Sequence, residues 1–492
     1  MSSSPSLAIR AFLAITLMIG FYAMAIAITG VLLYLPYAEI VYAHRIHIRL
    51  VFFCLVGAGI ILWSIVPRPD RFAPPGPRLE EGQHPRLFGE LTGVARAVGQ
   101  PMPSEVYLVP EVNAWVAQRG GVMGFGSRRV MGLGLPLLQV LTISQLRAVL
   151  AHEFGHYHGG DTKLGPWVYK TRAAIGRTLQ GLASQKSILL YPFLWYGKIF
   201  LRVTHAISRR QEFTADELAS RTVGSRPLID GLRAIHGATV AYSPYWTSEA
   251  TPVLDAGFRP PLAEGFARFV ASAPIARAIA ESIDSELKEG KSDPYDTHPP
   301  LRDRIAAVES FPKGEQLSLD LPAISLLDNV QELETRLLAA FADESKVRAL
   351  KPVSWENVGA EVHIPAWESF VRQQAAALAN LTAAALPQIS KNLGEVGRKM
   401  SYPAGTLPSS EDQARLAVGL LGAALAVALH KQGWELHTLP GELYFQHGEF
   451  RIEPFDILQR LSSGALTANA WWQECSAAGI LDLRLDDNTP AQ

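Results

Sequence analysis

An uncharged, strongly apolar run over residues 11–35 constrains this chain more than any other feature. A run of this length crosses a bilayer as a helix, because a helix satisfies its own backbone hydrogen bonds inside hydrocarbon. The alternative is a secretory signal peptide, but the run is too long for a signal core and a single arginine flanks it. A second uncharged run, residues 50–66, is near the lower limit for a span. The two runs predict a transmembrane hairpin over residues 1–70.

Composition agrees with a membrane-associated protein. Charged residues are only 18% of the chain, and the mean hydropathy is positive. The net charge of −1 gives no support for nucleic-acid binding. The two cysteines, Cys54 and Cys475, lie far apart and predict neither a disulfide framework nor a cysteine metal site. A metal in this protein must therefore be bound by histidines and carboxylates.

The distribution of basic residues predicts the orientation of the hairpin. One arginine precedes the first run and three follow the second, whereas the connector between the runs holds two. The positive-inside rule then places both ends of the hairpin in the cytoplasm. We expect a multi-pass membrane protein whose catalytic domain faces the cytoplasm.

A short pattern, His152-Glu153-Phe154-Gly155-His156, predicts a metal site. A capping-box pattern over residues 142–145 and apolar residues at helical spacing predict that the pattern lies on a helix. Two histidines four residues apart then share one helix face and can bind one metal ion. Glu153 lies beside that ion without being needed as a ligand, as in zinc hydrolases that use the glutamate as general base.

A second helical segment carries Glu212 and Asp216, which are four residues apart and so share a face. An H-E-x-x-H site needs one further carboxylate ligand, and a second carboxylate can accept a hydrogen bond from the far nitrogen of a ligating histidine. A solvated acidic face is the ordinary alternative. His298, before Pro299-Pro300, is by itself an ordinary loop histidine.

Three short strands are expected before the metal helix, at residues 105–109, 113–117 and 129–133, with a glycine-rich turn between the last two. An exposed edge strand there would pair with an extended peptide through backbone hydrogen bonds, although the strands also fit an ordinary core. Residues 187–197 are apolar and aromatic but too short to span, and fit a buried, interfacial or re-entrant helix.

These motifs together resemble the integral-membrane H-E-x-x-H zinc metallopeptidases of the HtpX and CAAX prenyl endopeptidase type. The resemblance covers residues 75–310 and implies a gluzincin-like domain. It implies that one zinc ion per chain is bound by His152, His156 and Glu212, with Glu153 beside it as general base. It also implies that Asp216 and Asp161 contact the site from outside and that His298 lies near the substrate. The substrate-side strand would carry Asn113 and Ala114. Only one weak candidate exists here for the two further spans of HtpX-type enzymes.

The predicted fold class is mainly α with a small β-sheet (α+β), in three parts. These are the hairpin at 1–70, a zinc metallopeptidase domain at 71–312 and a soluble C-terminal α+β domain of unknown function at 313–492. Within the last part, residues 326–341 and 366–386 are expected to be helices, residues 416–429 a packed helix, and residues 434–454 a β-hairpin.

The predicted function is that of a membrane-anchored zinc metalloendopeptidase. A metal-activated water would hydrolyse peptide bonds of protein or peptide substrates, in quality control or processing of membrane proteins. The alternative is a catalytically degenerate membrane scaffold whose C-terminal domain binds a partner protein. A zinc-dependent amidase acting on a non-protein substrate is a weaker third reading.

Overall fold

The chain begins with two long apolar helices, α1 (Leu7–Ala43) and α2 (Ile48–Ile65). The computed structural model describes residues 7–66, 68, 72–121, 126–156, 165–291, 293, 295–314, 319–402 and 408–486. Within these ranges, three helices are long and apolar enough to cross a membrane, namely residues 12–43, 48–65 and 410–431. The first two are the predicted hairpin.

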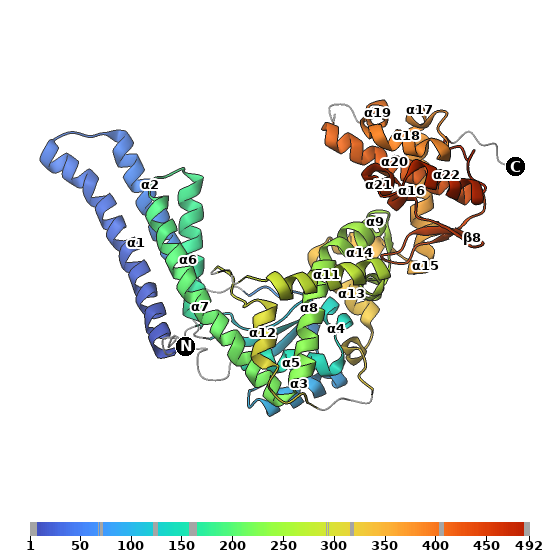
Figure 1. Ribbon diagram of the computed structural model, residues 1–492. Helices are drawn as coiled ribbons and strands as arrows, with labels where there is room; N and C mark the ends of the chain where they lie inside the picture. Colours follow the sequence, from blue (N-terminus) through green and yellow to red (C-terminus); the bar gives the residue numbers. More distant parts are fainter. Residues whose placement is uncertain are drawn as a thin grey trace. The chain divides into compact units, whose positions relative to one another are not determined.

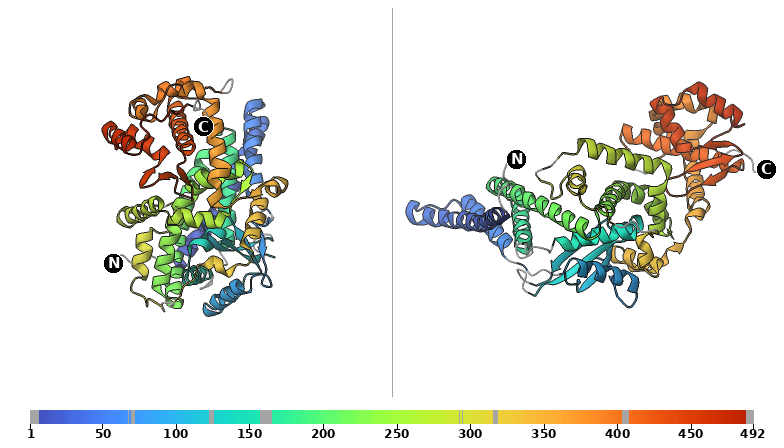
Figure 2. Two further views of the ribbon diagram at one scale, coloured as in Figure 1. Left: turned by 90° about the vertical axis from the view of Figure 1, so that its right-hand side faces the viewer. Right: turned by 60° about the horizontal axis from the view of Figure 1, so that its bottom comes forward.

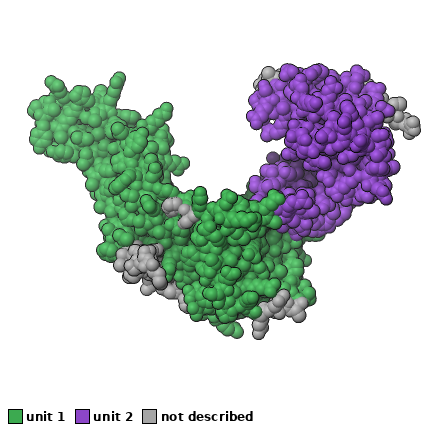
Figure 3. Space-filling view, viewed as in Figure 1, with its two compact units in different colours: residues 1–239, 279–341 green, residues 240–278, 342–492 purple. Residues whose placement is uncertain are grey.

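The described residues divide into two compact units (Figure 3). Unit 1 comprises Met1–Thr239 and Ile279–Phe341, and unit 2 comprises Val240–Ala278 and Ala342–Gln492. Both units are mainly helical with small sheets, which confirms the predicted α+β class.

Two further helices of unit 1, α6 (Gly165–Ser184) and α7 (Leu190–Thr222), pack against α1 and α2 (Figure 1). All four contribute buried apolar side chains to one core, including Phe21, Cys54 and Phe193. The Tyr196 hydroxyl donates a hydrogen bond of 2.6 Å to the carbonyl of Leu17 on α1. The apolar stretch at 187–197 is thus mostly the first turns of α7, packed on the hairpin.

Next to this bundle, unit 1 contains a four-stranded sheet with the order β1-β2-β4-β3. Its strands are β1 (Arg78–Leu79), β2 (Glu105–Val109), β3 (Ala114–Arg119) and β4 (Arg128–Gly134). β2 pairs with β4 in parallel, and β3 pairs with β4 as an antiparallel hairpin. The three predicted strands are present, and β3 lies at an edge of the sheet.

The helices of unit 1 around this sheet complete the frame of the site (Figures 1 and 2). α5 carries the expected capping box, in which Thr142 and Gln145 bond each other's backbone N–H groups. α12 begins directly after Pro299-Pro300, as expected of a helix after a proline turn. The helices are α3 (Pro85–Ala97), α4 (Leu135–Val140), α5 (Ile143–Gly155), α8 (Ser225–Tyr245), α11 (Ala273–Glu289), α12 (Leu301–Val308) and α13 (Val330–Phe341). The last residues of α8 and the first of α11 belong to unit 2.

Unit 2 is built around α20 (Ser410–Lys431), whose residues from Ala417 to Leu429 are largely buried in one apolar core. This third apolar helix is therefore packed inside protein, as expected from its length. A three-stranded antiparallel sheet of β7 (Glu435–His437), β8 (Tyr444–His447) and β9 (Phe450–Ile452) forms the predicted hairpin region. Gly441 and Gly448 occupy its turns with φ of 80° and 60°.

The other elements of unit 2 are short. The expected single helix over 366–386 is wrong, because Asn380 adopts φ +60° and interrupts it. In its place are α16 (Ile364–Gln373), α17 (Ala375–Leu378) and a 3-10 turn at Ala383–Ala385. The remaining helices are α9 (Thr251–Asp255), α10 (Leu262–Ala271), α14 (Glu344–Ala349), α15 (Trp355–Val358), α18 (Leu386–Ile389), α19 (Leu393–Lys399), α21 (Pro454–Ser463) and α22 (Ala468–Ala477).

Candidate metal centre

Two helices far apart in sequence, α5 and α7, cross at the predicted metal site. Gly155 makes the close crossing possible, since a Cβ there would lie 3.2 Å from the Cα of Ala215. α5 ends at Gly155, and His156 follows as its C-cap in a helical conformation with φ −59°. Both histidines of the pattern therefore face α7.

The carboxylate of Glu212 lies between the two histidines. Its Oε2 is 3.4 Å from Nε2 of His152, and its Oε1 is 3.5 Å from Nε2 of His156. Glu212 is 6% exposed, and its Oε2 has no hydrogen-bond partner among the described residues. Two imidazole nitrogens and a buried, unsatisfied carboxylate oxygen thus converge, which is an arrangement suited to a cation.

Glu153 borders the same point. Its carboxylate lies within 4.8 Å of a donor atom of each histidine, so distance alone does not distinguish it from Glu212 as a ligand. Its surroundings do, because Glu153 also receives a backbone hydrogen bond from Val116 on β3. Glu153 is therefore held toward the edge strand, whereas the buried Oε2 of Glu212 lies beside His152 and makes no hydrogen bond to a described residue.

Asp216 contacts Nδ1 of His152, the ring nitrogen that points away from Glu212. Its Oδ1 is 2.8 Å from Nδ1 of His152, which leaves Nε2 directed at Glu212. Asp216 has no exposed surface. It also accepts two hydrogen bonds from Arg304 on α12, from Nε at 2.8 Å and from a terminal nitrogen at 2.7 Å. A carboxylate on the second nitrogen of a histidine fixes the tautomer and orientation of the ring.

Arg304 is the residue of this site that sequence reasoning missed. Besides Asp216, its guanidinium lies 3.4 Å from Nδ1 of His152 and 3.6 Å from Oε2 of Glu212. In the sequence, Arg304 is one of two arginines in the segment after His298, and nothing distinguishes it from Arg302. No spacing rule connects that arginine with a helix nearly 90 residues earlier, so only the folded chain shows its place.

His298 lies near the site but is not part of its hydrogen-bond network. Its Nε2 is 3.9 Å from Oε1 of Glu212, and its side chain is 62% exposed. The loop that carries it is tied to α7, because Arg209 donates hydrogen bonds to the carbonyls of Asp293 and Asp296 at 3.1 and 2.7 Å. His298 can therefore face a ligand at the metal while remaining open to solvent.

The structure describes two of the remaining predicted residues, Asn113 and Ala114, but not Asp161. Ala114 is buried at the start of β3, and Asn113 is exposed just before it. The Asn113 carbonyl accepts a hydrogen bond of 2.8 Å from Gly134, so the entry to the edge strand is fixed. Asp161 and the glycines at 159–160 expected to end the helix lie outside the described residues.

Charges in the metal-free protein favour a cation at this point. Burial disfavours a charged ring at His152, but the hydrogen bond to Asp216 and the neighbouring carboxylate of Glu212 outweigh it and raise the pKa of His152 to about 9. Burial would raise the pKa of Glu212, but the adjacent ring of His152, followed by the charge of Arg304, lowers that pKa to about 2. The carboxylates of Asp216 and Glu212 thus stabilise positive charge on His152, at the point where a metal ion would be bound.

The pKa values of Glu153 and His156 shift in the directions opposite to those of Glu212 and His152. Burial raises the pKa of Glu153 to about 7. Burial, followed by the charge of His152, lowers the pKa of His156 to about 4, so that this ring is neutral near pH 7. A neutral ring is the form that binds a metal, and a carboxylate with a pKa near 7 is suited to accept a proton and release it.

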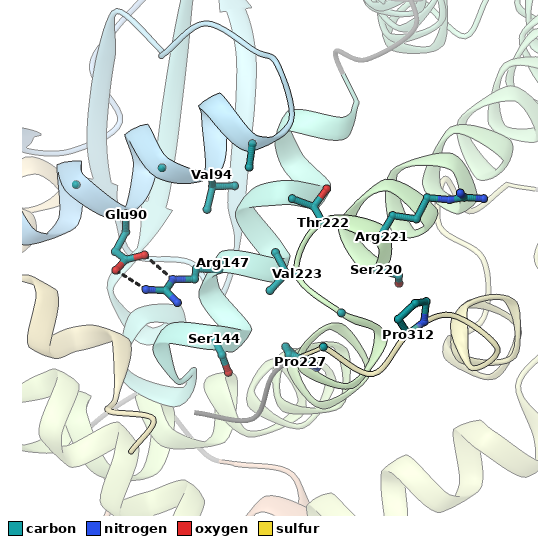
Figure 4. Close-up of a pocket in the computed structure, with 15 residues that line it drawn as sticks. Glu90, Val94, Ser144, Arg147, Ser220, Arg221, Thr222, Val223, Pro227 and Pro312 are labelled. Carbon is teal, nitrogen blue, oxygen red and sulfur yellow. Dashed lines mark hydrogen bonds and ion pairs between the residues drawn. The ribbon is translucent and has the colours of Figure 1, made fainter. Parts of the chain in front are cut away.

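A separate cavity of about 630 Å³ lies between α3, the first half of α5 and the end of α7 (Figure 4). Arg147 lines it and forms two hydrogen bonds to Glu90, at 2.6 and 2.8 Å. None of the predicted site residues lines this cavity. The metal centre is therefore defined by its side chains and not by this hollow.

Comparison with known proteins identifies the part of the chain that carries the site. Residues 82–311 match the family model of peptidase family M48. This part of the chain, a little under half of its length, is therefore similar to peptidase family M48. The matched residues include every predicted site residue.

Several curated proteins that are similar to this chain are named protease HtpX or protease HtpX homolog. The protease HtpX homolog of Tropheryma whipplei (strain TW08/27) is 27% identical over 162 residues, which are 30% of this chain and 54% of the relative. The homolog of Chlorobium phaeobacteroides (strain BS1) is 26% identical over 246 residues, covering 46% and 68%. Protease HtpX of Idiomarina loihiensis is 28% identical over 169 residues, covering 30% and 56%. This chain thus spans about half the length of the first relative. These matches confirm the resemblance to HtpX-like metallopeptidases. No solved structure matches the chain.

Proposed function

We propose that the protein is a membrane-anchored, zinc-dependent endopeptidase that hydrolyses peptide bonds with Glu153 as general base. The observation that carries the proposal is the convergence of His152, His156 and Glu212 beside a partly buried Glu153. A purely structural metal site has no use for a base at that position. The match of residues 82–311 to the model of a metal-dependent peptidase family supports the same conclusion.

Zinc is the metal that this donor set suits best. Two imidazoles and one carboxylate, with a position left for water, are typical of catalytic zinc sites. His152, His156 and Glu212 would hold the ion, and Asp216 would orient His152. When bound, zinc would act as a Lewis acid and lower the pKa of a water molecule toward neutrality.

Glu153 would take the proton of the attacking water and pass it to the leaving amine. Its burial raises its pKa to about 7, which suits both halves of that transfer at neutral pH. The backbone hydrogen bond from Val116 keeps its carboxylate beside the edge strand. His298 would donate a hydrogen bond to the developing oxyanion, since it faces the site from the solvent side.

The edge strand β3 would hold the substrate. Because β3 pairs with β4 on one side only, its other edge offers backbone groups to an extended peptide. Asn113 and Ala114 stand where that strand begins, on the same sheet edge that holds Glu153 through Val116. A peptide added as a further strand would place its backbone along the base. Asp161 remains a predicted outer contact of the site.

The physiological role would be quality control or processing of membrane proteins, with the catalytic domain on the cytoplasmic side. The two apolar helices support the anchoring, and the distribution of arginines supports the orientation. Protease accessibility of the C-terminus in sealed vesicles tests the orientation. Protection from the outer face is expected, and cleavage there would contradict it.

Two substitutions test the catalytic proposal. Glu153→Gln should keep metal binding and slow casein cleavage by about 10²–10⁴-fold. Glu212→Ala should lose both metal and activity. Glu217→Ala is the matched control, because Glu217 lies on the same helix but is half-exposed and pairs with Arg221. Unchanged cleavage by Glu153→Gln, or unchanged metal content in Glu212→Ala, would overturn the assignment of that residue.

A further inference from the structure

Three basic side chains lie where α6 and α7 leave the four-helix bundle, and the catalytic proposal uses none of them. They are Lys170 and Arg172 on α6 and His205 on α7. The Nζ of Lys170, the Nε of Arg172 and both ring nitrogens of His205 are buried without a hydrogen bond to any described residue. His205 is only 7% exposed. Buried donors are normally paired, so this group calls for a ligand.

Two of these side chains, Arg172 and His205, come close to each other between two packed helices. α6 and α7 are in contact at Gly197, where a Cβ would lie 3.1 Å from Ile175. Arg172 is one turn beyond that contact on α6, and its charge lowers the pKa of His205. Burial also lowers the pKa of Arg172 itself, and no ion pair of Arg172 occurs among the described residues.

Among the described residues, Asp296 is the acid whose charge acts on His205, and the backbone of Tyr295 lies near its ring. Neither makes a hydrogen bond of normal geometry to it within the described chain. An uncompensated guanidinium beside a buried imidazole produces a positive potential, and the chemical group that satisfies both is an anionic oxygen.

The depth of this group along the bundle indicates the source of that anion. Arg177 on α6 donates two hydrogen bonds to the carbonyl of Ser64, at the end of α2. Arg172 lies five residues farther out, about 7.5 Å along the helix. The headgroup layer of a bilayer extends by a similar distance beyond its hydrocarbon core. Trp167 and Tyr169, at the outer end of α6, are 41% and 64% exposed, as in an interfacial aromatic belt.

The geometry points to a phospholipid site in which Arg172 and His205 bind the phosphate of one anionic lipid from the surrounding bilayer. α7 also carries Glu212 about two turns farther out, so the bound headgroup would brace the helix that supplies the candidate metal ligand. This inference does not depend on catalysis. It adds a lipid to the contacts that hold α6 and α7 together.

Lipid binding by the purified full-length protein tests the site. Protein carrying Glu153→Gln, which avoids self-digestion, is titrated in uncharged detergent with phosphatidylglycerol, and bound lipids are counted by native mass spectrometry. Arg172→Gln should weaken the tightest lipid by about 10- to 100-fold, the range expected for one charge-assisted hydrogen bond. Arg172→Lys should retain most of the binding. Arg210→Gln is the matched control, because Arg210 is an exposed arginine on α7.

A stability measurement guards against a folding defect. Arg172 is unpaired within the described chain, so in lipid-free detergent Arg172→Gln should melt no lower than the parent protein. Added phosphatidylglycerol should raise the melting temperature of the parent and not of the variant. Equal lipid binding by Arg172→Gln and Arg210→Gln would overturn the proposal.

Two other outcomes would also overturn it, by assigning the site to another anion. In one, inorganic phosphate stabilises the parent but not Arg172→Gln, while both bind lipid equally. In the other, Arg172→Gln leaves lipid binding unchanged and, in protein that retains Glu153, raises KM only for peptides with a free C-terminal carboxylate.

Discussion

Arg304→Ala should destabilise the protein strongly, although Arg304 belongs to no recognised metal-binding pattern. Its two hydrogen bonds to Asp216, at 2.8 and 2.7 Å, are charge-assisted, and Asp216 has no exposed surface. Removing one partner of a buried ion pair costs about 3–5 kcal/mol, because the other charge stays buried. At roughly 2–4 °C per kcal/mol, the melting temperature should fall by about 6–20 °C.

Arg304→Lys separates charge from geometry. Lysine keeps the positive charge but lacks the planar fork that bonds both carboxylate oxygens. It should therefore lose one hydrogen bond, worth about 1.5–3 kcal/mol for a charged pair. The lysine protein should melt between the parent and Arg304→Ala.

Circular dichroism of the metal-free protein in detergent measures these changes. Arg302→Ala is the control, since Arg302 lies on the same helix, is 48% exposed and pairs with the neighbouring Asp303. It should change stability by less than about 0.5 kcal/mol. If Arg304→Ala melted within 2 °C of Arg302→Ala, the reasoning from a buried pair would be refuted, with 2 °C as roughly the effect of 1 kcal/mol.

Four further predictions concern the metal site. Glu153 must be deprotonated to act as base, and burial raises its pKa to about 7. A bound cation would favour the charged form, so kcat/KM should fall as the pH drops through 7 or through a somewhat lower value. A flat profile from about pH 8 to 5 would contradict this. Asp216→Ala should weaken metal binding by about 10- to 100-fold in chelator competition, and unchanged affinity would remove its orienting role. Gly155→Val should abolish metal binding, because its side chain would push against Ala215; full zinc content would show that the close crossing is not required. His298→Ala should lower kcat by about 10²–10³-fold with metal content unchanged, whereas an effect on metal content alone would argue for a structural role.

The local patterns of the sequence were reliable guides to local structure. The capping box over residues 142–145 starts α5, the apolar runs form α1 and α2, and the three expected strands appear in the sheet. Each of these depends on neighbouring residues only, so spacing and chemistry suffice. Where a local pattern was misread, at 366–386, one residue in a left-handed conformation broke a helix that composition favoured.

Tertiary structure decided which side chains meet. Spacing places His152 and His156 on one face, but only the crossing of α5 and α7 at Gly155 brings Glu212 within 3.5 Å of both. Arg304 became part of the site for the same reason, since α12 packs against α7 and directs a buried cation at Asp216. The sequence determines local geometry because backbone hydrogen bonding and side-chain period act over a few residues. Contacts between distant segments depend on how whole helices pack, and no spacing along the chain records that.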